Sequence, residues 1–212
     1  MFDNIQNLIL DFGGVLVDLD RQGWIESFNK LGFNDFEEVF NDKGTNTVFK
    51  QFELGQISSE QFCKTLKHHC NAGTTDEQVA EAWNTLLTGI PRQRLRKLLS
   101  LRDRYVVYLL SNTNVLHWNH SAQTYFNYHG FTIDDYFEEL FLSFQMNQMK
   151  PDPGIYHSII ARTGIMPFNT LYLDDMKENC DTAARLGFNT HLVTPDEDWT
   201  ELFADPIPNY DR

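Results

Sequence analysis

The chain has 212 residues, of which 42% are hydrophobic and 22% charged, a composition typical of a globular protein rather than a disordered one. Its formal net charge of −13 disfavours nucleic acids and anionic membranes as partners, because phosphate backbones are bound by clustered Lys and Arg. The N-terminus lacks the pattern of a secretory signal, no apolar run is long enough to span a bilayer, and the three cysteines lack metal-site spacing, so we expect a cytoplasmic protein.

The first predicted element is a short buried strand at residues 7–11, which ends in Asp11 and is followed by two glycines. Four later apolar runs have the length of buried strands: residues 105–110, 140–144, 171–173 and 190–193. Helical stretches separate several of these runs: residues 91–104, 115–128, 153–163 and 177–186. Strand–helix alternation of this kind predicts an α/β fold, a doubly wound parallel sheet with a Rossmann-like core.

Residues 17–90 have a different pattern, with no convincing apolar strand and several helix signals. Two segments match a capping box, in which side chains satisfy the free amides of a helix start: Ser58-x-x-Gln61 and Thr75-x-x-Gln78. We therefore expect a helical cap at residues 17–90, inserted into a core that is formed by residues 1–16 and 91–212. Loops on such a cap commonly set specificity, so residues 49–58 are expected to influence substrate choice.

Polar residues stand where open α/β sheets place their sites, at the carboxyl ends of strands. Asp11 comes before Gly13 and Gly14, which bring backbone amides beside the acid at little steric cost. Ser111 ends another apolar run just before a helix, where a hydroxyl and the following amides can hold phosphate oxygens. Lys150 precedes a helix that begins with proline, and a buried ammonium there would neutralise a carboxylate and a phosphate together.

The strongest single signal is the pair Asp174 and Asp175, which closes an apolar strand. Two adjacent acids in such a place are costly unless they are paired or bound to a metal. Hard oxygen ligands suit Mg²⁺, which keeps several waters and takes one or two carboxylates, so Mg²⁺ is the expected cofactor. His117 and His120 lie three residues apart on an expected helix and form a weaker alternative metal site, without an evident third ligand.

In this order, the four polar signals resemble the haloacid dehalogenase-like superfamily, and the resemblance covers nearly the whole chain. Within the superfamily, the strings are similar to those of the bacterial alpha-D-glucose-1-phosphate phosphatases: a strand ending Asp11-x-Gly13, then Ser111-Asn112-Thr113-Asn114, Lys150-Pro151 and Asp174-Asp175-x-x-x-Asn179. The resemblance implies a phosphatase that acts on a small phosphorylated metabolite, plausibly a sugar phosphate such as a hexose 1-phosphate. The sequence carries no signal for the oligomeric state.

The resemblance also implies a role for each matching residue. Asp11 would be the nucleophile that forms an aspartyl-phosphate. The transferring group would be held by Ser111, Asn112 and Lys150. The Mg²⁺ ligands would be Asp11, Asp175 and the backbone carbonyl of Gly13. Asp174 would orient the waters on the metal, with Asn179 further out.

One departure concerns Gly13, where most phosphatases of the superfamily carry a second aspartate that serves as general acid and base. The absence of this second aspartate predicts a steep dependence of the rate on leaving-group pKa. Asp18 is the first alternative acid to test. Two other readings stay open at this point. A hydrolytic dehalogenase uses the same aspartate without a metal, although the paired acids would then repel the nucleophile. A catalytically weakened protein that binds a phosphorylated ligand is the non-enzymatic alternative.

Overall fold

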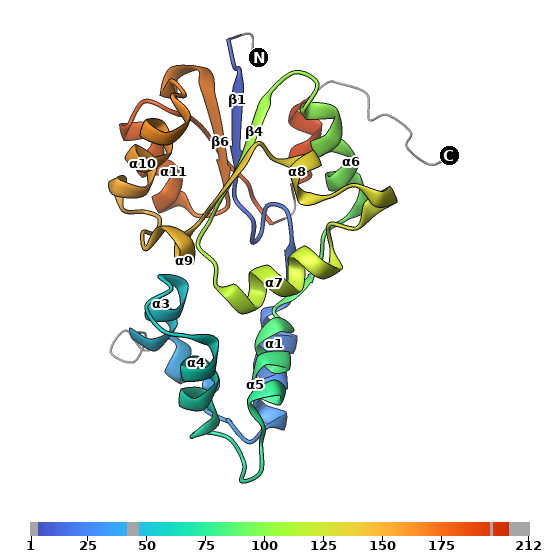
Figure 1. The fold of residues 1–212 in the computed structure, drawn as a ribbon, viewed down its shortest axis with the longest axis vertical. Helices are drawn as coiled ribbons and strands as arrows, with labels where there is room; N and C mark the ends of the chain where they lie inside the picture. The colour runs from blue at the N-terminus through green and yellow to red at the C-terminus, as the bar shows by residue number, and fades with distance from the viewer. Residues whose placement is uncertain (1–3, 42–46, 196, 204–212) are drawn as a thin grey trace.

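The computed structural model describes residues 4–41, 47–195 and 197–203, and its centre is a five-stranded parallel sheet (Figure 1). The strand order is β5-β4-β1-β6-β7. The strands have these bounds: β1 Asn7–Leu10, β4 Val106–Ser111, β5 Glu139–Leu142, β6 Thr170–Asp174 and β7 Asn189–Leu192. Each neighbouring pair is parallel, as the strand–helix alternation predicted. The predicted fold class is therefore confirmed.

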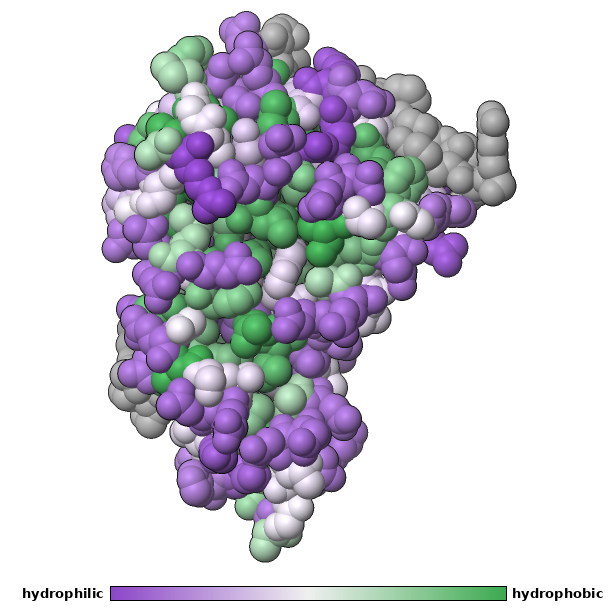
Figure 2. Space-filling view, in the orientation of Figure 1, coloured by the Kyte–Doolittle hydropathy of each residue, from purple (hydrophilic) through white to green (hydrophobic). Residues whose placement is uncertain are grey.

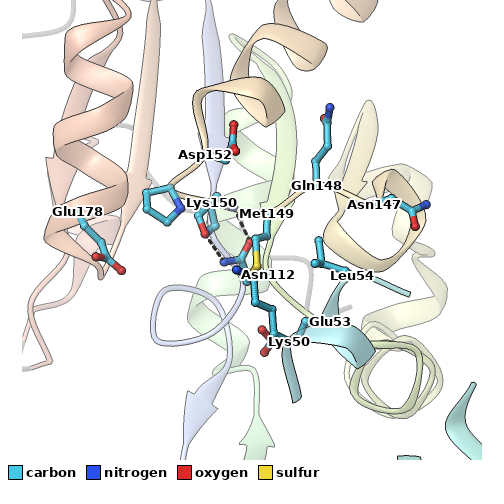
Figure 3. A pocket seen from close by; sticks show the side chains of 11 residues that line it. Lys50, Glu53, Leu54, Asn112, Asn147, Gln148, Met149, Lys150, Asp152 and Glu178 are labelled. Carbon is cyan, nitrogen blue, oxygen red and sulfur yellow. Dashed lines mark hydrogen bonds between the residues drawn. The ribbon is translucent and has the colours of Figure 1, made fainter. Parts of the chain in front are cut away.

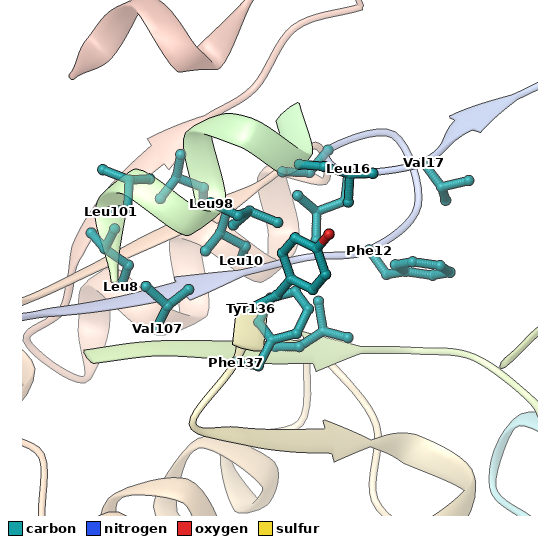
Figure 4. Packing of buried hydrophobic residues seen from close by; sticks show 14 of the residues in the cluster. Leu8, Leu10, Phe12, Leu16, Val17, Leu98, Leu101, Val107, Tyr136 and Phe137 are labelled. Carbon is teal, nitrogen blue, oxygen red and sulfur yellow. The ribbon is translucent and has the colours of Figure 1, made fainter. Parts of the chain in front are cut away.

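Helices cover both faces of this sheet because successive residues of a buried strand point to opposite sides. The helices that follow residue 90 in the chain have these bounds: α6 Arg92–Leu101, α7 Val115–Thr124, α8 Ile133–Tyr136, α9 Ser143–Met146, α10 Pro153–Thr163 and α11 Lys177–Arg185. Leu8 and Leu10 of β1 pack with Leu98 of α6 and Tyr136 of α8 on one face (Figure 4). Ile9 packs on the other face, in the cluster that includes α10 and α11.

After β1, the chain leaves the sheet, and its described residues before β4 form five helices beside a short ribbon and then α6 against the sheet. The five helices have these bounds: α1 Arg21–Lys30, α2 Phe36–Asn41, α3 Thr47–Glu53, α4 Ser59–Lys67 and α5 Asp76–Asn84. Both predicted capping boxes are present, at the starts of α4 and α5. Figure 1 shows these helices below the carboxyl ends of the strands. The division of the chain into a core and a cap at residues 17–90 stays a prediction.

The ribbon corrects one detail of the sequence analysis, which expected no strand within residues 17–90. β2 (Asp18–Leu19) pairs antiparallel with β3 (Leu87–Gly89), so the excursion begins and ends at one place. Strands of two and three residues are too short to show a period-2 pattern, and for this reason the sequence did not reveal them.

The helices α1–α5 enclose a second hydrophobic cluster that consists mainly of aromatic rings. Trp24, Phe28, Phe36, Phe62 and Trp83 are each at most 3% exposed. Figure 2 shows polar residues over much of one face of the molecule and apolar residues near its middle, where the sheet region meets these helices. In the described ranges, no helix has both the length and the apolar character that crossing a lipid bilayer requires.

Candidate active site

Three adjacent strands bring the predicted site residues to one edge of the sheet. Asp11 directly follows β1, Ser111 ends β4 and Asp174 ends β6, and β1 lies between the other two strands. The three residues are at most 7% exposed. The chain turns to opposite sides of β1 at this point, and such a switch in strand order opens a crevice at the carboxyl ends of a parallel sheet.

Lys150 joins two of these strand ends. Its Nζ lies 2.8 Å from Oδ1 of Asp11 and 2.7 Å from Oδ2 of Asp174, and it donates to the Leu110 carbonyl at 3.0 Å. The side chain is only 1% exposed. Burial alone would lower the pKa of Lys150, but the two carboxylates together raise it above its ordinary value, so the ammonium stays charged.

Asn112 holds the backbone of Lys150 in place. Its Nδ2 donates to the Lys150 carbonyl at 2.8 Å, and its Oδ1 accepts from the Lys150 amide at 2.8 Å. Both atoms of the side-chain amide are therefore engaged in positioning the lysine. Direct contact of Asn112 with a substrate stays a prediction, and the second N–H of its Nδ2 remains available for it.

Asp11 has one engaged and one open carboxylate oxygen. Oδ1 faces Lys150 and also accepts from the amide of Phe12 at 2.7 Å. No hydrogen bond or ion pair from the described residues reaches Oδ2. Burial raises the pKa of Asp11, whereas Lys150 acts to lower it. A further cation would favour the ionised form, in which Oδ2, without a hydrogen-bond partner among the described residues, can act as a nucleophile.

Asp174 is fully buried, and both of its oxygens are engaged. Oδ2 accepts from Lys150 and from the Tyr172 hydroxyl. Oδ1 accepts from the Met176 amide at 2.8 Å and from Nδ2 of Asn179 at 2.9 Å. Burial acts to raise the pKa of Asp174, but Lys150 and these hydrogen bonds outweigh it and lower the pKa. Asp174 is thus an ionised residue that organises its neighbours.

Asp175 differs from Asp174 because no described side chain donates a hydrogen bond to its carboxylate. It is half-buried, and burial followed by repulsion from Asp174 raises its pKa. Carboxylate oxygens of Asp11, Asp174 and Asp175 all lie within 4.8 Å of one another. A compact set of hard oxygens with one poorly compensated acid fits a divalent cation such as Mg²⁺.

The two glycines after Phe12 serve different purposes. Gly14 has a φ of +73°, and a Cβ there would collide with the Asp175 carboxylate, so only glycine lets the loop pass this close. At Gly13, a Cβ would meet only Leu19, at 3.6 Å, which is an ordinary contact. The space around Gly13 thus accepts the first atom of a side chain, in contrast to Gly14. Metal binding by its carbonyl stays a prediction.

Two residues that the sequence analysis considered do not join this cluster. Asp18 is exposed on β2 and forms an ion pair with Arg94, with 2.7 Å between Oδ1 and Nη1. His117 is buried, with its Nε2 3.0 Å from the Trp83 carbonyl and its Nδ1 3.3 Å from Asn114. Burial lowers the pKa of His117 to about 4. Both of its ring nitrogens are engaged, and His117 joins α5 to α7 rather than binding a metal.

A pocket of about 590 Å³ opens beside Lys150, between α3 and the loop that precedes α10 (Figure 3). Its lining combines charged, amide and apolar side chains: Lys50, Glu53, Leu54, Asn112, Asn147, Gln148, Met149, Lys150, Pro151, Asp152 and Glu178. The sequence analysis singled out the segment 49–58 but not Glu53 within it. The only available signal was its position just before the turn at Gly55, which does not reveal what the side chain faces.

Comparison with known proteins agrees with the geometry of the site. Residues 5–187 match the family described as haloacid dehalogenase-like hydrolase. The chain is 35% identical over 199 residues to D-ribitol-5-phosphate phosphatase of Bacteroides thetaiotaomicron, a match that covers 93% of this chain and 96% of that protein.

Solved structures agree with this assignment. A HAD family enzyme of the same organism, in complex with magnesium and inorganic phosphate, has a TM-score of 0.89 and 42% identity, over 94% of this chain and 99% of that one. A HAD-like family hydrolase described as predicted, from Porphyromonas gingivalis, has a TM-score of 0.84 and 34% identity, over 95% and 99% of the two chains. The magnesium complex agrees with the metal expected at the acidic cluster. The chain belongs to the haloacid dehalogenase-like hydrolases.

Proposed function

We propose that this protein is a magnesium-dependent phosphatase that hydrolyses the phosphate monoester of a small sugar or sugar alcohol. The observation that carries the proposal is the buried Asp11–Lys150–Asp174 arrangement, which leaves Oδ2 of Asp11 open beside a fixed ammonium. An anionic nucleophile can approach an anionic phosphate only if positive charge screens both. Lys150 supplies one such charge from the protein itself.

In this proposal, Asp11 attacks phosphorus through Oδ2 and forms an aspartyl-phosphate, which water then hydrolyses. Lys150 holds the attacking carboxylate and a phosphate oxygen together, while the Ser111 hydroxyl binds a second oxygen from the end of β4. Asp11, Asp175 and the Gly13 carbonyl would hold Mg²⁺, which supplies further charge neutralisation at the phosphate when bound. Asp174 keeps Lys150 oriented, and Asn179 in turn fixes Asp174.

The substrate class rests on the pocket and on the relatives. A volume of about 590 Å³ lies within the range common for small-molecule sites, and its amide and charged side chains suit a ligand with many hydroxyl groups. The relative named for D-ribitol 5-phosphate supports a sugar alcohol as readily as the hexose 1-phosphate that the sequence motifs suggest. We propose that α1–α5 act as the cap that closes over this substrate.

A panel of phosphorylated metabolites tests the proposal, with released inorganic phosphate as the readout. It contains ribitol 5-phosphate, hexose 1-phosphates, hexose 6-phosphates, nucleotides and acyl phosphates. We expect Mg²⁺-dependent turnover that is fastest for a sugar or sugar-alcohol phosphate and is lost on chelation. Halide release from a haloacid without metal would favour a dehalogenase. Binding of phosphate esters without turnover would favour a ligand-binding protein.

A further inference from the structure

Among the described residues, the two positions considered for a proton donor on the core side of the site, Gly13 and Asp18, do not supply one. A sugar-alcohol phosphate has an alkoxide leaving group, which departs slowly unless it is protonated as the P–O bond breaks. Gly13 has no side chain to do this, and Asp18 is held in an ion pair with Arg94. The following inference rests on the proposed function and concerns where this proton comes from.

Glu53 is the last residue of α3 and faces the site from the cap side. It shares the wall of the pocket with Lys150 and Asn112, and Figure 3 shows it across the pocket from these two core residues. In the part of the chain that the structure describes, no hydrogen bond or ion pair engages its carboxylate. Lys150, which contacts Asp11, is also the residue whose charge acts on Glu53. Glu53 therefore lines the same pocket as Lys150, the residue that contacts the nucleophile.

The backbone around Glu53 is fixed to the core although its side chain is free. The Ser143 hydroxyl donates to the Glu53 carbonyl at 2.6 Å. The hydroxyl oxygen of Ser143 also accepts from the Thr113 amide at 3.0 Å. Gly55, with a φ of +66°, packs so closely on the Phe144 carbonyl that a Cβ would collide with it. These contacts connect the end of α3 to the start of α9 and, through Ser143, to the turn after β4, so the backbone of Glu53 has a defined position.

The chemistry of Glu53 suits a residue that carries a proton at neutral pH. Burial raises its pKa to about 7, although the charge of Lys150 acts in the opposite direction. The other acids that line the pocket are placed differently. Asp152 caps α10 by accepting from the Gly154 amide at 2.7 Å, and Glu178 is exposed.

We infer that Glu53 is the general acid and base of the reaction, supplied by the cap in place of the acid that is missing at Gly13. In the first step, Oδ2 of Asp11 forms a bond to phosphorus, the bond from phosphorus to the ester oxygen breaks, and that oxygen takes the Glu53 proton and leaves as an alcohol. In the second step, Glu53 takes a proton from water as the water attacks phosphorus. The bond from phosphorus to Asp11 then breaks, releasing phosphate and restoring both carboxyl groups.

The test is the dependence of the single-turnover rate on leaving-group pKa, measured with aryl phosphates of similar size and Mg²⁺. We expect a shallow dependence in the native enzyme, in place of the steep one that the missing acid at Gly13 predicts by itself. The dependence should become steep in Glu53→Gln, which preserves size but carries no acidic proton. Turnover of an alkyl phosphate such as ribitol 5-phosphate should fall by roughly 100-fold or more in this variant, in line with typical general-acid contributions. Turnover of para-nitrophenyl phosphate, whose leaving group needs little help, should fall by less than about tenfold.

Two variants act as controls, and a third probes rescue. Glu81→Gln removes an exposed carboxylate of α5, outside the residues that line the pocket, and should keep the native dependence. Asp11→Asn should abolish turnover of every substrate, which tests the proposed function separately from this inference. Gly13→Asp, for which the backbone has room, should flatten the dependence again when combined with Glu53→Gln. An unchanged dependence in folded Glu53→Gln, or a steep dependence in the native enzyme, would overturn the assignment.

Discussion

On the core side of the site, Nζ of Lys150 has three polar partners and the Asp174 carboxylate has four. On the cap side, the described residues provide no such partner for the side chains of Lys50 and Glu53. The core side therefore holds charges in fixed positions, as stabilisation of a transferring phosphate requires. The cap side keeps side chains available for a ligand, as selection among leaving groups requires. Variants on each side should consequently fail in different ways.

The largest effect is expected for the nucleophile on the core side. Asp11→Asn replaces a carboxylate by an amide that cannot attack phosphorus, so steady-state phosphate release should fall by at least about a thousandfold. The fold should persist because Lys150 retains its contact with Asp174. The measurement combines phosphate release with a thermal melt. Turnover close to that of the native enzyme in a folded variant would remove the basis of the proposed chemistry.

The adjacent acids separate stability from metal binding. Asp174→Asn leaves the buried Lys150 with one carboxylate fewer and should lower the free energy of unfolding by about 3–5 kcal/mol, the usual cost of breaking a buried pair. Asp175→Asn should leave stability nearly unchanged. It should weaken Mg²⁺ activation by more than about 100-fold, which exceeds the usual loss for a residue that only hydrogen-bonds to a metal ligand. Urea unfolding and Mg²⁺ titrations of activity check both. Equal Mg²⁺ shifts in the two variants would contradict the assignment of ligands.

Between the two sides, the buried His117 should make the free energy of unfolding depend on pH. Its folded pKa of about 4 lies below the ordinary value of 6.5, so the unfolded chain binds a proton that the folded protein does not. The stability associated with neutral His117 is present above pH 6.5 and is lost as the pH falls towards 4, by roughly 3 kcal/mol in total. His117→Gln should flatten the dependence of unfolding free energy on pH in this window. His157→Gln, at an exposed site on α10, is the control that should not.

The smallest effect is expected on the cap side, away from the reacting atoms. Leu54→Ala removes part of the pocket wall and so enlarges the pocket. The kcat/KM for ribitol 5-phosphate divided by that for a hexose 1-phosphate should therefore change by about tenfold or less. Turnover of para-nitrophenyl phosphate should hardly change. Leu202→Ala removes the same side chain outside the pocket and should leave the ratio as it is. An unaltered ratio in Leu54→Ala would argue against a role of this turn in specificity.

The sequence predicted the core side better than the cap side for a physical reason. A buried strand that ends in a polar residue is a local pattern, and the parallel sheet then brings Asp11, Ser111 and Asp174 to one edge. Glu53 meets the site only because the end of α3 packs on residues 143–144, a contact between segments about 90 positions apart. No local pattern encodes such a contact.

The cap segment shows the same limit in more detail. Residues 49–58 were expected to influence specificity, but Phe49 and Phe52 are 3% and 1% exposed and belong to the aromatic cluster. Only Lys50, Glu53 and Leu54 of this segment line the pocket. Helical periodicity identifies an apolar face, but it cannot tell which polar neighbour on the other face reaches a ligand.

The β2–β3 ribbon has a consequence for how such a protein can be remodelled. Because Asp18 pairs with Gly89, the chain returns to the point from which it departed. A two-residue hairpin turn could join these strands directly, and a helical unit of other origin could be spliced in at the same two positions, without altering any strand of the parallel sheet. New substrate preferences can thus be acquired by exchanging one contiguous stretch of the gene. This stretch carries the proton donor proposed at Glu53 with it, while Asp11, Ser111 and Lys150 are inherited unchanged.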